Sequence, residues 1–196
     1  SGGVYHYNAL THSLELRAGV SGALWQDITS HFETEGFLMG LSSIFWRESW
    51  KYGERAFRYC NHDAGHALAA LSIAANLFGW KVTYLSELSD DAVEGVLGLN
   101  QEGYCQLEKE HPDLLCLVYP QQKKTIPSSL PNEIISALID LPFSGHPNQL
   151  SSERIDWEII YKTADLTRKP RTADHLFNCG NRIWFTKSSS QFSAPE

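Results

Sequence analysis

The sequence lacks the features that mark membrane, nucleic-acid-binding and disulfide-stabilised proteins. No apolar run approaches the roughly 20 residues of a membrane span, and no charged-then-apolar leader opens the chain. Its 16 basic residues are outnumbered by 23 acidic ones, and the net charge of -7 argues against a general affinity for nucleic acid or anionic lipid. The 4 cysteines show no paired short spacing, so reduced thiols are the simpler interpretation. We therefore expect a cytoplasmic protein with no nucleic-acid or membrane partner.

The signature motifs of common nucleotide and hydrolase sites are also missing. No G-x-G-x-x-G, P-loop or G-x-S-x-G pattern is present, so Rossmann, NTPase and α/β-hydrolase sites lack support. The composition is otherwise ordinary for a folded protein, and 196 residues suffice for one main domain. The chain starts at Ser1, directly before a predicted strand, so we expect a trimmed product or an internal fragment.

Periodic patterns along the chain predict an α+β fold. Strands are expected over residues 4–7, 13–17, 37–46, 81–84 and 114–119, and helices over residues 21–32, 47–59, 64–78, 88–99 and 156–167. The first two strands predict an antiparallel hairpin. The helix from residue 64, with Asp63 as its expected cap, has apolar or small residues on neighbouring faces and is expected to be buried on more than one side. The mixed order of helices and strands favours α+β over a regular βαβ repeat.

Prolines divide the chain after the last predicted strand. Pro127, Pro131, Pro142 and Pro147 lie in polar segments typical of connectors. We therefore expect the main domain over residues 1–146. Residues 147–196 are expected to form a connector helix followed by a disordered tail.

The densest group of chemically active side chains lies between residues 47 and 66. Arg47, Arg55 and Arg58 could hold a phosphate, and Lys51 beside Tyr52 could act as a general base. An ion-paired helix surface is the alternative interpretation of the same charges.

Cys60, His62 and His66 suggest a second alternative, a zinc-binding module. The two histidines would share one helix face at a spacing of four. Structural zinc needs four protein ligands, however, and no second Cys or His pair lies nearby. The competing expectation is that no metal binds here. His62 would then lie at the start of a helix, and His66 would be buried and hydrogen-bonded.

Three segments resemble the SagB-type dehydrogenases, also called thiazole or oxazole oxidase-like, of the nitroreductase superfamily. They are GVYHYNALTHSLELR (residues 3–17), WKYGERAFRYCNHDAGHALAALSIAANLFGW (residues 50–80), and VEGVLGLNQE followed by HPDLLCLVYP (residues 93–120). The first two are specific in combination, and the third is supportive. The resemblance covers more than half of the chain.

The resemblance implies an FMN-binding α+β fold, with a mixed, mainly antiparallel sheet flanked by helices. It implies a homodimer or a tandem pair of nitroreductase-like units with flavin between them, and hydride transfer between flavin and a small molecule or a peptide azoline. Lys51 then becomes the general base, with Tyr52 in a supporting proton or orienting role. Arg47, Arg55 and Arg58 become flavin or phosphate contacts, while Tyr59 is expected to pack.

Two of the family's segments are missing from this chain. The family has an N-terminal Arg-Arg-Ser-type segment that holds the FMN phosphate and a Pro-Ser-Gly-rich segment beside the flavin ring. Only Ser1-Gly2-Gly3 resembles either of them. We therefore expect a partial nitroreductase-like domain, with residues 150–172 resembling the connector to a second unit. A non-catalytic interaction or structural domain is the main alternative.

Overall fold

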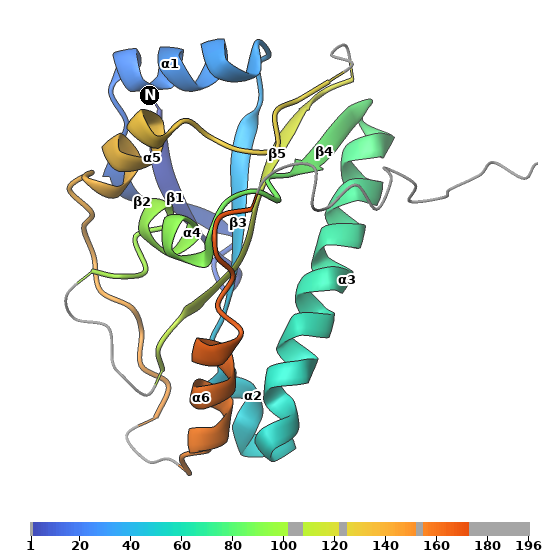
Figure 1. Ribbon diagram of the computed structural model, residues 1–196, viewed down its shortest axis with the longest axis vertical. Coiled ribbons are helices and arrows are strands. Elements are labelled where there is room, and N and C mark those ends of the chain that lie inside the picture. The colour runs from blue at the N-terminus through green and yellow to red at the C-terminus, as the bar shows by residue number, and fades with distance from the viewer. Residues whose placement is uncertain (1, 102–107, 122–124, 152–154, 173–196) are drawn as a thin grey trace, which may run out of the picture.

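A three-stranded antiparallel sheet with helices on both faces forms the centre of the molecule (Figure 1). The computed structural model describes residues 2–101, 108–121, 125–151 and 155–172. In chain order the elements are β1 (Gly3–Asn8), β2 (Ser13–Gly19), α1 (Gly22–Phe32), β3 (Phe37–Ser43), α2 (Phe45–Tyr52), the short 3-10 helix η1 (Gly53–Arg55), α3 (Ala56–Leu77), β4 (Trp80–Tyr84), α4 (Asp90–Val96), β5 (His111–Pro120), α5 (Asn132–Ile139) and α6 (Glu158–Leu166). The predicted α+β class is confirmed, and both sheets are antiparallel.

Strand β5 lies at the centre of this sheet because its sequence is a continuous apolar run. It pairs with β3 on one side and with β4 on the other. Residues 114–119 are all buried, as expected of a strand that is covered on both faces. Leu115, Leu117 and Tyr119 pack into the main core, and the residues between them lie on the opposite face, toward α3.

The main core lies between the sheet and helices α1, α4 and α5. Phe32 of α1, Val93 of α4 and Leu138 of α5 are buried in it. Helix α1 starts where the sequence predicted, because Ser21 caps it: the Ser21 hydroxyl accepts the Leu24 backbone N–H at 3.2 Å. The predicted β1–β2 hairpin is also confirmed and forms a separate two-stranded sheet.

Helix α3 lies on the opposite face of the sheet, and α2 and α6 lie beside its N-terminal end (Figure 1). A second, smaller core joins these three helices. It consists of Phe45 from α2, Ala56 and Cys60 from α3, and Ile160 from α6. The expected connector helix is therefore packed into the described fold and completes this core.

The break between α2 and α3 lies at Gly53, so the expected helix start after Asp63 is wrong. Helix α3 runs from Ala56 to Leu77 without interruption, and Asp63 lies inside it. Gly53 has φ of 58° and ψ of -139°, a conformation that essentially only glycine adopts. This backbone conformation ends α2, whereas Asp63 has no comparable effect on α3.

The expectation that α3 is buried on more than one side is also wrong for the described chain. Only Ala56, Cys60 and Ala75 are buried along this helix. Ile73 and Leu77 are 56% and 80% exposed. Helix α3 therefore presents large apolar side chains to the outside.

Three further boundaries differ from the sequence expectation. Strand β3 ends at Ser43, because residues 45 and 46 already belong to α2. Helix α5 was missed within the proline-rich region, and α4 is shorter than the expected helix over residues 88–99. Within the described residues, no helix combines the length and the apolar composition that a membrane crossing requires.

Candidate functional site

Helix α2 and the start of α3 bring most of the predicted site residues to one corner of the molecule. Phe45 and Ser49 anchor α2 because both are buried. This orientation leaves Lys51 exposed and Tyr52 partly exposed in the last turn of the helix. Gly53 then turns the chain beneath Trp157, whose ring would lie 3.2 Å from a Cβ atom at position 53.

Two tyrosines and three cations form the basic–aromatic corner, which we define as Lys51, Tyr52, Arg55, Arg58 and Tyr59. The ring centroids of Tyr52 and Tyr59 are 4.7 Å apart. Lys51 Nζ lies 5.0 Å from the Tyr52 centroid. The guanidinium carbons of Arg55 and Arg58 lie 6.0 and 5.9 Å from the Tyr59 centroid. These separations lie within the roughly 6 Å range of cation–π attraction, so the five side chains form one contiguous group.

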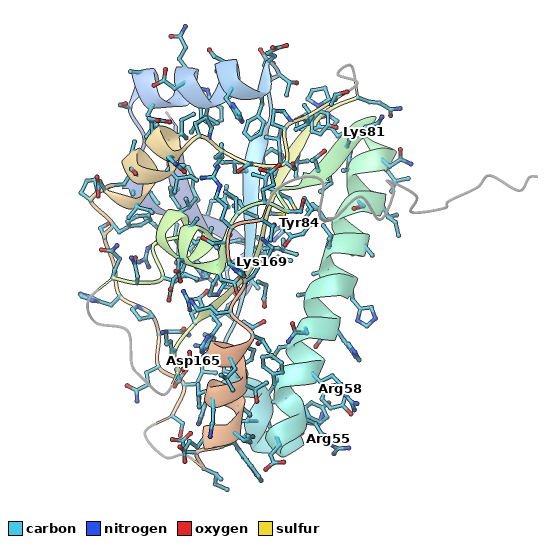
Figure 2. The ribbon with its side chains drawn as sticks, viewed as in Figure 1. Arg55, Arg58, Lys81, Tyr84, Asp165 and Lys169 are labelled. Atoms are coloured by element: carbon cyan, nitrogen blue, oxygen red, sulfur yellow. The ribbon has the colours of Figure 1, made fainter. Side chains whose placement is uncertain are left out.

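The positive charges of the corner outnumber the one acidic residue within its stretch of the described chain, Glu54. Among the described residues, none of Lys51, Arg55 and Arg58 forms an ion pair with an acidic side chain. All three are exposed, and Arg55 and Arg58 lie on the side of α3 that faces away from α6 (Figure 2). The first turn of α3 contains no acidic residue. The corner is thus a locally positive surface on a protein whose net charge is -7.

Arg47, the third arginine predicted to contact flavin, is held in a separate ion pair. Its guanidinium lies 3.2 Å from the carboxylate of Glu108 and donates to Asn148 Oδ1 at 2.9 Å. The Glu108 side chain is 4% exposed and also accepts the backbone N–H groups of Leu150 and Ser151. Arg47 therefore links α2 to residues 148–151, and these contacts occupy its guanidinium.

Replacing Arg47 with methionine is expected to lower the free energy of unfolding by about 2 kcal/mol, because the buried Glu108 carboxylate loses its charged partner. A larger loss is not expected, since the Arg47 side chain is 30% exposed and water screens the pair. Urea denaturation measures the change. Arg58→Met is the control, with an expected change within about 0.5 kcal/mol. Equal losses in the two variants would contradict the structural role of Arg47.

The structure does not bring the residues of the zinc alternative together. Cys60 is buried against α2 and α6, whereas His62 and His66 are exposed on α3. Burial raises the pKa of the Cys60 thiol to about 11, which disfavours the thiolate that zinc requires. The His66 side chain is 82% exposed and lies 3.5 Å from the Asp63 carboxylate. The expectation of a buried His66 is therefore wrong. In the part of the chain that the structure describes, no group of three or more His, Cys, Asp or Glu side chains could hold a metal.

Two titratable side chains with shifted pKa values, the buried His111 and the partly buried Asp113, lie at the start of β5, and the sequence patterns did not reveal them. Burial, together with the nearby Lys109 charge, lowers the pKa of His111 to about 4. Burial raises the pKa of Asp113 to about 6, although a hydrogen bond from Ser43 Oγ at 2.7 Å opposes this shift. The His111 ring packs against Phe45 with centroids 4.5 Å apart. Both groups are enclosed between elements, so we assign them to stability and not to ligand binding.

The chemistry of the basic–aromatic corner fits both parts of FMN. Guanidinium groups bind phosphate oxygens in pairs, and tyrosine faces stack on planar rings. Because its cations are all exposed, the corner alone would contact only one side of a ligand. Sequence reasoning found four of its members and expected Tyr59 only to pack. Tyr59 follows Tyr52 by seven residues, but the break at Gly53 lies between them, so helical spacing alone does not account for their contact.

Comparisons of the chain with protein-family models, with curated proteins and with solved structures found no match.

Proposed function

We propose that this chain is one unit of an FMN-dependent oxidoreductase of the nitroreductase or SagB type. The observation that carries the proposal is the basic–aromatic corner, in which Lys51, Arg55 and Arg58 lie against two neighbouring tyrosine rings and form no ion pair with a described acidic side chain. Arg55 and Arg58 would hold the flavin phosphate. Arg47 is omitted from this assignment because Glu108 and Asn148 already bind its guanidinium.

Bound FMN would supply the hydride chemistry, and the chain would supply proton transfer and orientation. Lys51 is the proposed base that removes a proton from the substrate, which is a small molecule or a peptide azoline. Its Nζ lies 5.0 Å from the Tyr52 ring centroid and Lys51 is exposed at the end of α2, so a ligand at the corner could reach both side chains. Tyr52 would orient the substrate or assist proton transfer.

The proposal includes a second nitroreductase-like unit, either another copy of the chain or a linked domain. The exposed corner covers only one side of a flavin, so a second surface is needed to enclose the ligand. Trp50, at one end of the same helical region, is 73% exposed, and Ile73 and Leu77 are exposed further along α3. Exposed apolar side chains of this size occur where one protein contacts another, and we assign these residues to such a contact as part of the proposal.

A non-catalytic interaction domain is the second candidate function. The occupied guanidinium of Arg47 favours it, because one of the three predicted flavin contacts already has a structural role. The exposed apolar side chains of α3 would serve this function equally well. Flavin binding separates the two candidates.

Titrating the purified chain with FMN tests the proposal, with flavin fluorescence as the measurement. The double variant Arg55→Gln/Arg58→Gln is expected to weaken FMN binding at least about tenfold, because one charge-assisted hydrogen bond contributes about 1.5 kcal/mol or more. Lys81→Gln removes an exposed charge from β4 and is the matched control, with an expected change below about twofold. Absence of FMN binding at any protein concentration, or equal effects in both variants, would contradict the flavin assignment.

Lys51→Ala tests the catalytic assignment separately from flavin binding. It is expected to leave the Kd for FMN within about threefold, since a neighbouring charge contributes little at an exposed site. Turnover of a synthetic thiazoline peptide by the flavin-loaded protein is expected to fall about 100-fold, the size of a typical general-base contribution. Unchanged turnover would remove Lys51 from the proposed mechanism.

A further inference from the structure

Helix α6 buries little apolar surface against the rest of the chain. In this helix, which the structure describes in full, Ile160 is the only buried residue. Trp157 and Ala164 are partly buried beside it, whereas Ile159 and Leu166 are 48% and 78% exposed. One buried aliphatic side chain supplies only a small part of the burial that holds a domain together. Other interactions must therefore help to hold α6 in place.

Charged side chains hold the end of α6 to α4, toward which the segment after α6 runs (Figure 1). Arg168 Nε donates to Asp91 Oδ1 at 2.6 Å, and the Arg168 guanidinium also donates to the Glu94 carboxylate. The Lys169 N–H donates to Asp90 Oδ2 at 2.8 Å, and the Asp90 N–H donates to the Lys169 carbonyl at 3.0 Å. The Arg168 and Asp91 side chains are 28% and 80% exposed, so dissolved salt screens this contact.

The contacts beyond Lys169 are polar as well. The Thr172 N–H donates to the Glu87 carbonyl at 3.1 Å, and the Thr172 hydroxyl donates to the Ser86 carbonyl at 3.1 Å. Pro170 is the only apolar residue between positions 168 and 172, and it is exposed. Residues 168–172 are therefore attached by charge and hydrogen bonding, without a buried apolar side chain.

The α6 segment, which we define as residues 157–172, covers the smaller core and not the main one. Ile160 packs with Phe45 and Cys60 in the smaller core, whereas the main core contains no described residue of the α6 segment. Cys116 lies at the centre of the three-stranded sheet, in β5, and is 0% exposed. Loss of the α6 segment would therefore uncover Cys60 and leave Cys116 buried in the sheet.

We propose that the α6 segment is a detachable strap, which opens as one unit under the control of the Arg168 ion pairs while the three-stranded sheet stays folded. Local openings of this kind occur where few buried apolar contacts hold an element. Opening also acts on Gly53, because the Trp157 ring lies 3.2 Å from the position of a Cβ atom there. Without this ring, the break between α2 and α3 loses a support and the basic–aromatic corner can rearrange. The inference does not depend on the proposed flavin chemistry.

Modification of the cysteine thiols of the full chain with N-ethylmaleimide tests the proposal, and peptide mass spectrometry follows each cysteine separately. Cys60 becomes accessible when the α6 segment opens, whereas Cys116 requires the sheet to unfold. We expect Cys60 to react at least about 100-fold faster than Cys116. Raising the NaCl concentration from about 0.05 to about 1 M shortens the range of charge attraction. This change is expected to accelerate the reaction of Cys60 about fivefold and that of Cys116 less than about twofold.

Arg168→Gln distinguishes opening of the α6 segment from other routes to Cys60. The ion pairs of Arg168 are with α4, so the substitution weakens the α6 segment without a change in α2 or α3. The reaction of Cys60 is expected to accelerate about tenfold, as for the loss of one charge-assisted hydrogen bond, and that of Cys116 less than about twofold. Lys162→Gln is the matched control, because Lys162 is exposed on α6 and forms no ion pair with a described acidic side chain. It is expected to change the Cys60 rate less than about twofold.

Three results would overturn the proposal. Equal reaction rates of Cys60 and Cys116 in the unsubstituted chain would show that α6 detaches only when the whole protein unfolds. An unchanged Cys60 rate in Arg168→Gln would show that the ion pairs do not control the opening. Equal acceleration of both cysteines in this variant would show that Arg168 stabilises the whole fold and not the α6 segment alone.

Discussion

Replacing Gly53 with alanine is expected to lower the free energy of unfolding by about 3 kcal/mol. The first cause is the backbone, because φ of 58° with ψ of -139° costs an L-residue about 1–3 kcal/mol. The second cause is packing, since the new methyl group would lie 3.2 Å from the Trp157 ring and α6 would have to shift. Urea denaturation measures the loss.

Gly65→Ala is the matched control for this substitution. Gly65 lies inside α3, and an added Cβ would meet no atom within 4 Å. Alanine is the better helix former, so this variant is expected to gain about 0.5–1 kcal/mol. The two substitutions add the same methyl group, but the expected changes in the free energy of unfolding have opposite signs. A loss below about 1 kcal/mol for Gly53→Ala would show that position 53 tolerates an L-residue and does not fix the break between α2 and α3.

The position of Gly53 also bears on the proposed function. It separates Lys51 and Tyr52 from the other three members of the basic–aromatic corner, in which the Tyr52 and Tyr59 rings are 4.7 Å apart. A change in the angle between α2 and α3 would separate these rings. Gly53→Ala is therefore expected to weaken FMN binding as well, whereas Gly65→Ala is not, and the titration used for Arg55 and Arg58 measures both.

Elements with a strong local pattern were predictable from the sequence. Strand β5 is a continuous apolar run, and α1 combines Ser21 as cap with apolar residues spaced by four. The hairpin β1–β2 was predictable because two alternating segments flank a short polar connection. In these cases the local pattern and the tertiary packing favour the same structure.

Elements that depend on backbone conformation or distant partners were not predictable in this way. The turn at Gly53 was not predicted because its neighbours all favour helix. Asp63 is a more common type of N-cap residue, so the helix start was predicted there instead. Helix α5 was missed because prolines surround it, although Pro131 immediately before a helix is compatible with its start. Arg47 and Glu108 are 61 positions apart, and no local pattern links them.

The candidate site was predictable in composition but not in arrangement. The sequence placed Lys51, Tyr52, Arg55 and Arg58 within a short stretch, and the structure brings all four to one corner. Arg47 belongs to the same stretch but occupies a different environment. Sequence spacing alone cannot distinguish an exposed guanidinium from one that binds a buried carboxylate.

The stability of this protein is expected to change little with pH between about 4 and 6, because His111 and Asp113 act in opposite directions. Asp113 has a folded pKa of about 6 against an ordinary 3.8, so the folded state binds more protons in this range. Its contribution to stability is lost as pH rises through about 6. His111 has a folded pKa of about 4 against an ordinary 6.5, so here the unfolded state binds more protons. Its effect therefore makes stability rise with pH between about 4 and 6.5.

Single substitutions are expected to reveal the two opposing slopes. In Asp113→Asn only the His111 effect remains, so the free energy of unfolding should rise by about 3 kcal/mol from pH 4 to pH 6.5. In His111→Gln only the Asp113 effect remains, so the free energy of unfolding should fall by about 3 kcal/mol from pH 4 to pH 6. Urea denaturation at half-unit pH steps measures both slopes.

The double variant Asp113→Asn/His111→Gln separates this account from a general loss of packing. Without either group the profile between about pH 4 and 6 should again be nearly flat, whatever the absolute stability. Packing losses shift the whole curve, whereas proton binding changes only its slope, so the slope is the informative quantity. A flat profile in Asp113→Asn would show that burial does not shift the pKa of His111. A flat profile in His111→Gln would show the same for the pKa of Asp113. The start of β5 would then be more open to water than its packing against Phe45 and α6 implies.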